Sequence, residues 1–342
     1  MSLFFALVVL NILIFIHEFG HFLIAKRSGV EVERFSLGLG KEVLSVKRGE
    51  TRYSLCLLPF GGYVKMAGEN IGELQHRTGE FLTQPVGKRF WIIAAGSIFN
   101  YLFGFLLFFL IFVLGSSHFA PCVGRVKEGF PAQGILRKGD EVVAVNGRKV
   151  RSWEEMARVI QRSRGRVELI IEREGERKKV SILPRIEQGR KMIGIFPSGE
   201  IVKISYGPLS SLYLAGRKTL ELTILTYTGL WNLLRGKVSW KALTGPVGIV
   251  YLTGKVAERG ISSLFQFLAI LSISLALFNL LPFPVLDGGH LLFLGLEKVR
   301  KKPLSERTQQ IVQDIGVIIL FLLFIGVTWG DLLKISFWKT AP

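Results

Sequence analysis

The chain has 342 residues, of which 49% are hydrophobic, and its mean hydropathy of +0.40 is higher than that of an ordinary soluble domain. The formal net charge of +18 would suit a nucleic-acid partner, but the sequence contains no nucleic-acid-binding motif. Two cysteines are too few for a disulfide framework, so the composition favours a membrane protein over a secreted disulfide-rich one.

Four apolar stretches have the length that a membrane-spanning helix needs, roughly 20 residues at 1.5 Å per residue. They divide the chain into 1–26 (first span), 27–90 (β-rich connection), 91–115 (second span), 116–200 (compact domain), 201–263 (amphipathic connection), 264–290 (third span), 291–310 (short link) and 311–330 (fourth span). The first stretch lacks the basic n-region of a secretory signal and carries ionisable residues, so we interpret it as a retained helix. The predicted fold class is an α-helical polytopic membrane protein.

The distribution of basic residues predicts which connections face the cytoplasm. No Lys or Arg precedes Lys26, whereas eleven lie within 26–89 and five within 297–307. The positive-inside bias places both of these segments in the cytoplasm, and the residues between the second and third spans outside. Cys56 and Cys122 then lie on opposite sides of the membrane and cannot pair within one chain.

Strand patterns occupy the two longer connections. Within 27–90, short strands alternate with turn signals and indicate a small cytoplasmic sheet. Within 116–200, strands are predicted over 122–126, 141–146, 167–172 and 178–183, with a helix over 153–161. This second pattern is typical of a compact α+β domain inserted outside the membrane.

The connection 201–263 has apolar residues at helical spacing, but Arg217, Lys218 and Glu221 interrupt any spanning run. We interpret it as an amphipathic helix at the bilayer interface. A fifth span is the alternative, and it would reverse the predicted side of everything that follows.

An H-E-x-x-H sequence, His17-Glu18-Phe19-Gly20-His21, lies inside the first apolar stretch. Residues four apart on a helix lie one turn apart on the same face, so both imidazoles can bind one metal ion, and Glu18 beside them can act as a general base. Two buried histidines and a glutamate satisfied by helix neighbours would be the structural alternative. Because ionisable residues inside a span are costly, the pattern favours a metal-dependent hydrolase.

A catalytic zinc site usually takes a third protein ligand, and Asp287 is the candidate. If the third span runs inward, its end reaches the depth of His21, and Asp287 follows there. The prolines within 279–284 break the helix, so non-helical backbone is expected in a protein-lined site, and Gly288-Gly289 would allow a sharp turn. A helix N-cap role for Asp287, or His290 as the third ligand, are the alternatives.

These motifs, together with Asn279-x-x-Pro282-x-Pro284-x-Leu286-Asp287-Gly288-Gly289, resemble over nearly the whole chain the site-2 protease family of intramembrane zinc metalloproteases, in particular its RseP-like branch. The resemblance implies Zn²⁺ bound by His17, His21 and Asp287, with Glu18 as the catalytic base. It further implies substrate contacts by residues of the third span, the second span and a membrane-associated β-loop: Asn279, Pro282, Pro284, Asn100, Gly62, Tyr63 and Val64. The β-loop would present an edge to an unwound substrate strand.

The segment 119–196 resembles a bacterial PDZ module, with 192–196 as its expected peptide-binding loop. Two features depart from the family. The chain has room for one such module where RseP-like relatives carry two, and Ser97 stands where the family's G-P-x-x-N motif has proline. Asn100 in this motif could instead be a polar contact between helices.

The resemblance therefore implies an inner-membrane zinc endopeptidase that cleaves single-span membrane proteins, such as an anti-sigma factor or a remnant signal peptide. Its partners would be these substrates, the bilayer and a peptide C-terminus at the PDZ module, and no nucleic acid. The alternative is a non-catalytic, metal-binding PDZ scaffold or a transporter. No paired broken helices in two related halves support a transporter, and a scaffold would not need Glu18 beside its ligands.

Overall fold

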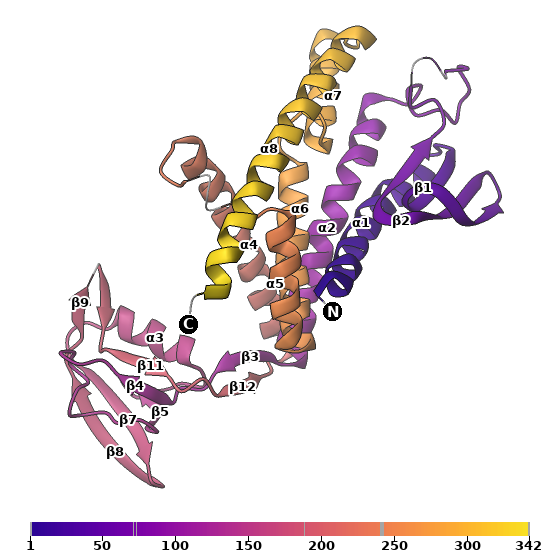
Figure 1. Ribbon diagram of the computed structural model, residues 1–342. Coiled ribbons are helices and arrows are strands. Elements are labelled where there is room, and N and C mark those ends of the chain that lie inside the picture. The colour runs from indigo at the N-terminus through magenta and orange to yellow at the C-terminus, as the bar shows by residue number, and fades with distance from the viewer. Residues whose placement is uncertain (1, 71, 73, 188, 240–242, 341–342) are drawn as a thin grey trace. The chain divides into compact units, whose positions relative to one another are not determined.

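The computed structural model describes residues 2–70, 72, 74–187, 189–239 and 243–340, except for the side chains of residues 60 and 335–340 (Figure 1). Residues 240–242, part of the predicted connection 201–263, lie outside the described residues. The chain forms two compact units: the first unit is Met1–Leu110 with Ser211–Pro342, and the second unit is Ile111–Ser210.

The first unit is built mainly of helices. They are α1 (Ser2–Arg27), α2 (Val86–Leu114), α4 (Pro208–Leu234, which begins in the second unit), α5 (Pro246–Glu258), α6 (Ile261–Asn279), α7 (Asp287–Arg300) and α8 (Glu306–Thr340). Within the described residues, four of these helices are long and apolar enough to cross a membrane: α1, α2, α6 and α8. Each overlaps one of the apolar stretches found in the sequence, but α6 ends at Asn279, well before residue 290, where the third predicted span ends.

The segment 201–263 differs from the single amphipathic helix that the sequence predicted. It contains α4 and a separate helix, α5, which packs along α1 and also contacts α6 and α8. Gly245 and Pro246 start α5, because proline suits the first turn of a helix. The backbone N–H of Gly248 in that turn donates to Asp331 Oδ2 at 2.8 Å, and Asp331 is 1% exposed. A buried carboxylate of α8 thus satisfies the N-terminus of α5.

The strands β1 (Val32–Arg48) and β2 (Thr51–Met66) are much longer than the short strands that the sequence predicted. They bend, so that Phe35–Leu37 of β1 pairs with two parts of β2: Tyr53–Leu55 on one side and Gly62–Val64 on the other. The end of β2 from Gly62 to Lys65 is therefore an edge, with no second strand partner among the described residues.

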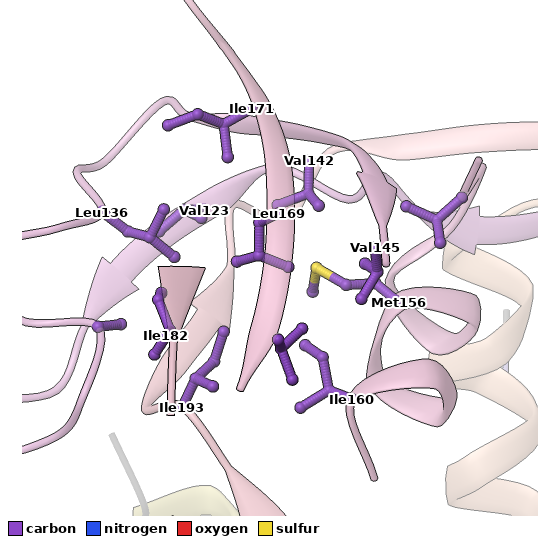
Figure 2. Packing of buried hydrophobic residues seen from close by; sticks show 13 residues of the cluster. Val123, Leu136, Val142, Val145, Met156, Ile160, Leu169, Ile171, Ile182 and Ile193 are labelled. Atoms are coloured by element: carbon purple, nitrogen blue, oxygen red, sulfur yellow. The ribbon is translucent and has the colours of Figure 1, made fainter. Parts of the chain in front are cut away.

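Besides the end of α2 and the start of α4, the described residues of the second unit form these elements: β3 (Ser116–Phe119), β4 (Val123–Val126), β5 (Glu141–Val145), β6 (Arg148–Lys149), α3 (Trp153–Arg162), β7 (Val167–Arg173), β8 (Glu176–Ile182), β9 (Arg185–Glu187), β10 (Arg190–Met192), β11 (Ile195–Pro197) and β12 (Ile201–Ile204). The main sheet has the order β6-β5-β7-β8, and β4 pairs with β11. Figure 2 shows apolar side chains of this sheet meeting Met156 and Ile160 of α3. The unit has its own hydrophobic core, as a domain requires.

One buried ion pair makes the stability of the second unit depend on pH. Asp140 is 1% exposed, and its carboxylate accepts from Arg173 Nε and Nη2, both at 2.7 Å, and from the Arg137 N–H at 2.8 Å. Burial alone would raise the pKa of Asp140, but the Arg173 guanidinium and the Arg137 amide lower it below its ordinary value. The unfolded carboxyl binds its proton at higher pH than the folded one. The pair therefore stabilises the unit above about pH 4, and this contribution is lost as the pH falls through the folded pKa.

We expect Asp140→Asn to lower the free energy of unfolding of this unit at pH 7 by about 1–3 kcal/mol, because Asn leaves Arg173 without its charged partner. Hydrogen exchange of peptides from β5 and β7 in the full chain measures the loss. Glu176→Gln, at an exposed position of β8, is the control. A parent protein whose exchange protection in this unit does not weaken between pH 7 and pH 3 would contradict the pairing.

Candidate metal centre

The two histidines of α1 lie with their Nε2 atoms 3.2 Å apart. Two ligands at 2.0–2.1 Å from a tetrahedral ion are separated by about 3.3 Å, so this spacing fits one zinc ion. His21 Nδ1 lies 2.8 Å from the carbonyl oxygen of Ile92 on α2, which fixes the ring when Nδ1 carries the proton. The Nε2 lone pair is then left for a metal, an arrangement common among metal-binding histidines.

Asp287 brings a carboxylate to these imidazoles from the first turn of α7. Its Oδ2 lies 3.5 Å from His17 Nε2, and its Oδ1 lies 3.7 Å from His21 Nε2. Ligand atoms of the three residues all lie within 4.8 Å of one another. The arrangement offers two imidazole nitrogens and a carboxylate oxygen to a cation, a donor set that suits catalytic zinc, which usually takes three protein ligands.

The two alternatives for this position find no support. The N-cap of α7 is Leu286, not Asp287, and no side chain caps the helix. His290 borders the same cavity, where its ring lies edge-on to Phe293, but within the described residues the group whose ligand atoms lie close enough together to hold one metal ion consists of His17, His21 and Asp287.

Gly288 and Gly289 do not form the sharp turn that the sequence suggested. Both lie in the first turn of α7, packed against the irregular backbone that joins α6 to α7. A Cβ on Gly288 would lie 2.1 Å from the carbonyl oxygen of Leu281, and one on Gly289 would lie 2.2 Å from that of Phe283. Their role is close backbone approach, which holds Asp287 at the start of the helix.

The helix α2 closes one side of the centre. A Cβ on Gly96 would lie 2.3 Å from His21 Nε2 and 2.7 Å from His17 Cε1, so only glycine fits there. Ser97, which is 0% exposed, donates from Oγ to Asp287 Oδ2 at 2.9 Å. Asn100 is also buried, and its Nδ2 lies 3.5 Å from His17 Nδ1.

The residues expected to contact substrate in the third span are only partly brought to the centre. Asn279, the last residue of α6, has its Nδ2 3.5 Å from both ring nitrogens of His17. Pro282 is exposed in the connection that follows, and Pro284 is half-buried beside Gly316 of α8. The two prolines therefore shape the connection, while Asn279 lies at the histidine.

The β2 edge lies beside Glu18. A Cβ on Gly62 would lie 3.4 Å from Glu18 Cγ, and the backbone of Val64 hydrogen-bonds to the Glu18 carboxyl group. Tyr63 and Val64 line the same cavity as Glu18, and the Tyr63 hydroxyl accepts from Arg34 Nη1 at 2.6 Å. The edge therefore brings both backbone and side chains to the cavity of the candidate catalytic base.

A cavity of about 1000 Å³ connects these groups with the start of α8. Besides His17, Glu18, His21 and Asp287, it is lined by polar residues of α2, α7 and α8, among them Arg89, Glu297, Gln309 and Gln313. Arg89 forms a two-bond ion pair with Glu297, with Nη1 to Oε2 at 3.1 Å, which joins α2 to α7. Polar walls of this kind can hold water beside a metal.

Sequence reasoning missed Gly96, the bond made by Ser97 and the Arg89–Glu297 pair. The only available signal for Ser97 was its replacement of the family's proline. Gly96 is the glycine of that same motif, but its contact with the imidazoles was not predicted, and the ion pair gave no signal; both depend on how α2 packs against helices distant in the sequence.

Comparisons with known proteins agree with this chemistry. The model of peptidase family M50 matches residues 5–323. The chain is 30% identical to the regulator of sigma-E protease RseP of Escherichia coli, over 93% of this chain and 95% of RseP. It is 29% identical to the regulator of sigma-W protease RasP of Bacillus subtilis, over 96% and 97% of the two chains, and 34% identical to a putative zinc metalloprotease of Rickettsia conorii, over 94% and 96%.

Solved PDZ domains are structural neighbours of the β-rich part of the chain. The PDZ domain of an SdrC-like protein of Listeria innocua covers 24% of this chain and 96% of its own, with a TM-score of 0.22 and 27% sequence identity.

Proposed function

The chain belongs to peptidase family M50, and we propose that His17, His21, Asp287 and Glu18 carry out its peptide hydrolysis near the cytoplasmic side of the bilayer. The protein is a multi-pass membrane zinc metalloprotease of the intramembrane type. This excludes the alternative of a non-catalytic scaffold or transporter. The observation that carries the assignment of residues is the cluster of three ligand atoms within 4.8 Å, with Glu18 adjacent on α1.

Each of the proposed site residues has a different role in peptide hydrolysis. Zinc, when bound, supplies a Lewis acid that polarises the scissile carbonyl group and makes water more acidic. Glu18 takes the proton of the attacking water and delivers it to the leaving amine nitrogen, so the proton lost by the nucleophile is returned to the product. Asn279 and Asn100, both beside His17, offer amide N–H donors to the substrate backbone.

A peptide bond in a helix must be extended before water can attack it. The β2 edge supports the proposal that the extended substrate segment binds there as an added strand. The N–H and C=O groups of Gly62–Lys65 that face away from β1 can pair with a substrate segment. Because the same edge lies against Glu18, a strand added there has its backbone beside the candidate base.

The distribution of charged residues supports an active site that lies near the cytoplasmic side of the membrane. Lys26 and Arg27 end α1 one turn beyond His21, and Lys298 and Arg300 lie in the last turn of α7. If these ends are cytoplasmic, the cavity beside Gln309 and Gln313 admits water from the cytoplasm, and the second unit lies outside.

The proposed substrates are single-span membrane proteins. RseP and RasP are named as proteases that regulate sigma factors, which favours a membrane-anchored anti-sigma factor as one substrate class. A remnant signal peptide is a second proposed substrate class, since it too is a single apolar helix in the membrane.

Purified protein in detergent should cleave a model single-span substrate, and removing zinc with 1,10-phenanthroline should abolish cleavage because no other group in the cluster can polarise the carbonyl. Added Zn²⁺ should restore the rate, and metal analysis should find about one zinc per chain. The proposal fails if cleavage continues at the parent rate in protein that metal analysis shows to be free of zinc.

We propose that the second unit is a PDZ module that binds a peptide C-terminus. Its groove between α3 and β10–β11 has a volume of about 190 Å³, and its lining includes Met156, Ala157, Ile160 and Ile193. The apolar walls suit an aliphatic last residue, and the backbone N–H groups of such loops suit a carboxylate.

We expect Ala157→Trp to weaken binding of a fluorescent peptide ending in valine at least about tenfold, because the indole fills the groove. Fluorescence anisotropy with the full chain measures the change, and the same peptide with an amidated C-terminus shows whether the carboxylate is recognised. Arg158→Ala, at the next and exposed position of α3, is the matched control. Equal binding by the parent and Ala157→Trp would show that the groove is not the peptide site.

A further inference from the structure

We propose that Ser97 is a positioning residue that orients the Asp287 carboxylate for zinc, a task that proline at this position cannot perform. This inference rests on the proposed role of Asp287 as a ligand. It assigns a function to the one position of the second span at which the chain departs from the G-P-x-x-N pattern.

The bond that carries the inference joins two distant parts of the chain. Ser97 Oγ donates to Asp287 Oδ2 at 2.9 Å across 190 residues, and Ser97 is 0% exposed. A serine inside a helix commonly donates back to the carbonyl group four residues earlier. Here the hydroxyl donates to a carboxylate on another helix instead.

The bond acts on the oxygen that lies nearer to His17. Asp287 Oδ2 is 3.5 Å from His17 Nε2, while Oδ1 is 3.7 Å from His21 Nε2, so one carboxylate oxygen lies near each imidazole. A donor held on α2 restricts rotation of the carboxylate away from this orientation. Hydrogen bonds from outside the ligand set orient metal-binding carboxylates, and their loss typically weakens metal affinity or activity 10–100-fold.

The surrounding helix explains why serine can act here. Gly96 allows the α2 backbone to lie against both imidazoles, which brings the next residue beside Asp287. Proline has no side-chain donor and no backbone N–H, and it disrupts helical hydrogen bonding. With serine, α2 continues as one helix from Val86 to Leu114 and gains a donor at the centre.

The test compares metal binding by the parent and by Ser97→Ala in full-length protein. Chelator competition with Zn²⁺ and the visible absorption spectrum of the Co²⁺-loaded protein are the readouts, because the Co²⁺ spectrum reports ligand geometry. We expect about 10–100-fold weaker zinc affinity and an altered Co²⁺ spectrum for Ser97→Ala. Ser97→Thr, which keeps the hydroxyl, should retain both properties of the parent.

Thr253→Val is the matched control for the loss of a buried hydroxyl. Thr253 is 0% exposed and donates to the Ile249 carbonyl group within α5, so its replacement should leave zinc affinity unchanged. The inference is overturned if Ser97→Ala binds zinc as tightly as Thr253→Val, or if Ser97→Thr and Ser97→Ala lose affinity equally.

A double-mutant cycle separates an effect through Asp287 from a general loss of structure. In an Asp287→Ala background the serine has no carboxylate to orient, so Ser97→Ala should cause no further loss of affinity. An equal loss in both backgrounds would overturn the inference. If Asp287→Ala itself leaves zinc affinity unchanged, the proposed ligand assignment fails; if it weakens zinc while Ser97→Ala does not, only the role of Ser97 fails.

Discussion

Glu18→Gln should lower hydrolysis of a single-span substrate by about 10³-fold while zinc stays at about one per chain. Gln keeps the shape of the side chain but cannot accept a proton from water, and a positioned general base contributes typically 10²–10⁴-fold to the rate. The backbone of Val64, which hydrogen-bonds to Glu18, and the neighbouring Gly62 can accommodate the amide, so the fold should be kept. Single-turnover cleavage together with metal analysis measures the two quantities separately.

Glu50→Gln is the matched control for this substitution. Glu50 is exposed, in the turn between β1 and β2, and pairs with Lys26, so its replacement should change the rate less than twofold. Full activity of Glu18→Gln would remove Glu18 from proton transfer. Loss of zinc together with activity would instead place Glu18 among the metal ligands.

The sequence alone was sufficient to predict the candidate metal ligands that lie close together in the chain. His17 and His21 lie four residues apart on a helix, and the helical period alone predicts that both reach one ion. Asp287 required a longer argument, the depth of the third span, and the structure brings its carboxylate to within 3.5 Å of His17. Local periodicity and bilayer thickness are strong constraints, which explains why these predictions could be made.

The remaining features depend on contacts between distant segments. The bend of β1 and β2 follows from their pairing register, which strand propensity does not encode, so the predicted short strands were wrong in length. The helix α5 was missed because its N-terminus is satisfied by Asp331, a residue of α8 that is distant in the sequence. The tight packing of Gly288 and Gly289 was mistaken for a turn, since a glycine pair suits either.

Gly96→Ala should disable the centre through a single methyl group. The added Cβ would lie 2.3 Å from His21 Nε2 and 2.7 Å from His17 Cε1, closer than nonbonded atoms approach. Either the imidazoles rotate away from each other or α1 separates from α2, and both movements displace the candidate ligand atoms. A displacement of about 1 Å at a reacting centre can cost about 10²-fold in rate, so we expect at least that loss, together with weaker zinc binding.

Gly87→Ala on the same helix separates this steric effect from helix propensity. Nothing lies within 4 Å of a Cβ at Gly87, and alanine is a better helix former than glycine, so the control should be at least as stable as the parent and fully active. Gly96 lies in the interior of α2, where alanine is favoured by about 0.8–1.0 kcal/mol, so any loss in Gly96→Ala must come from the contacts of the added Cβ with the imidazoles. Zinc affinity by chelator competition and the cleavage rate measure both variants. If Gly96→Ala has the zinc affinity and cleavage rate of the parent, the active enzyme does not hold His17 and His21 against α2, and the proposed set of ligands is wrong.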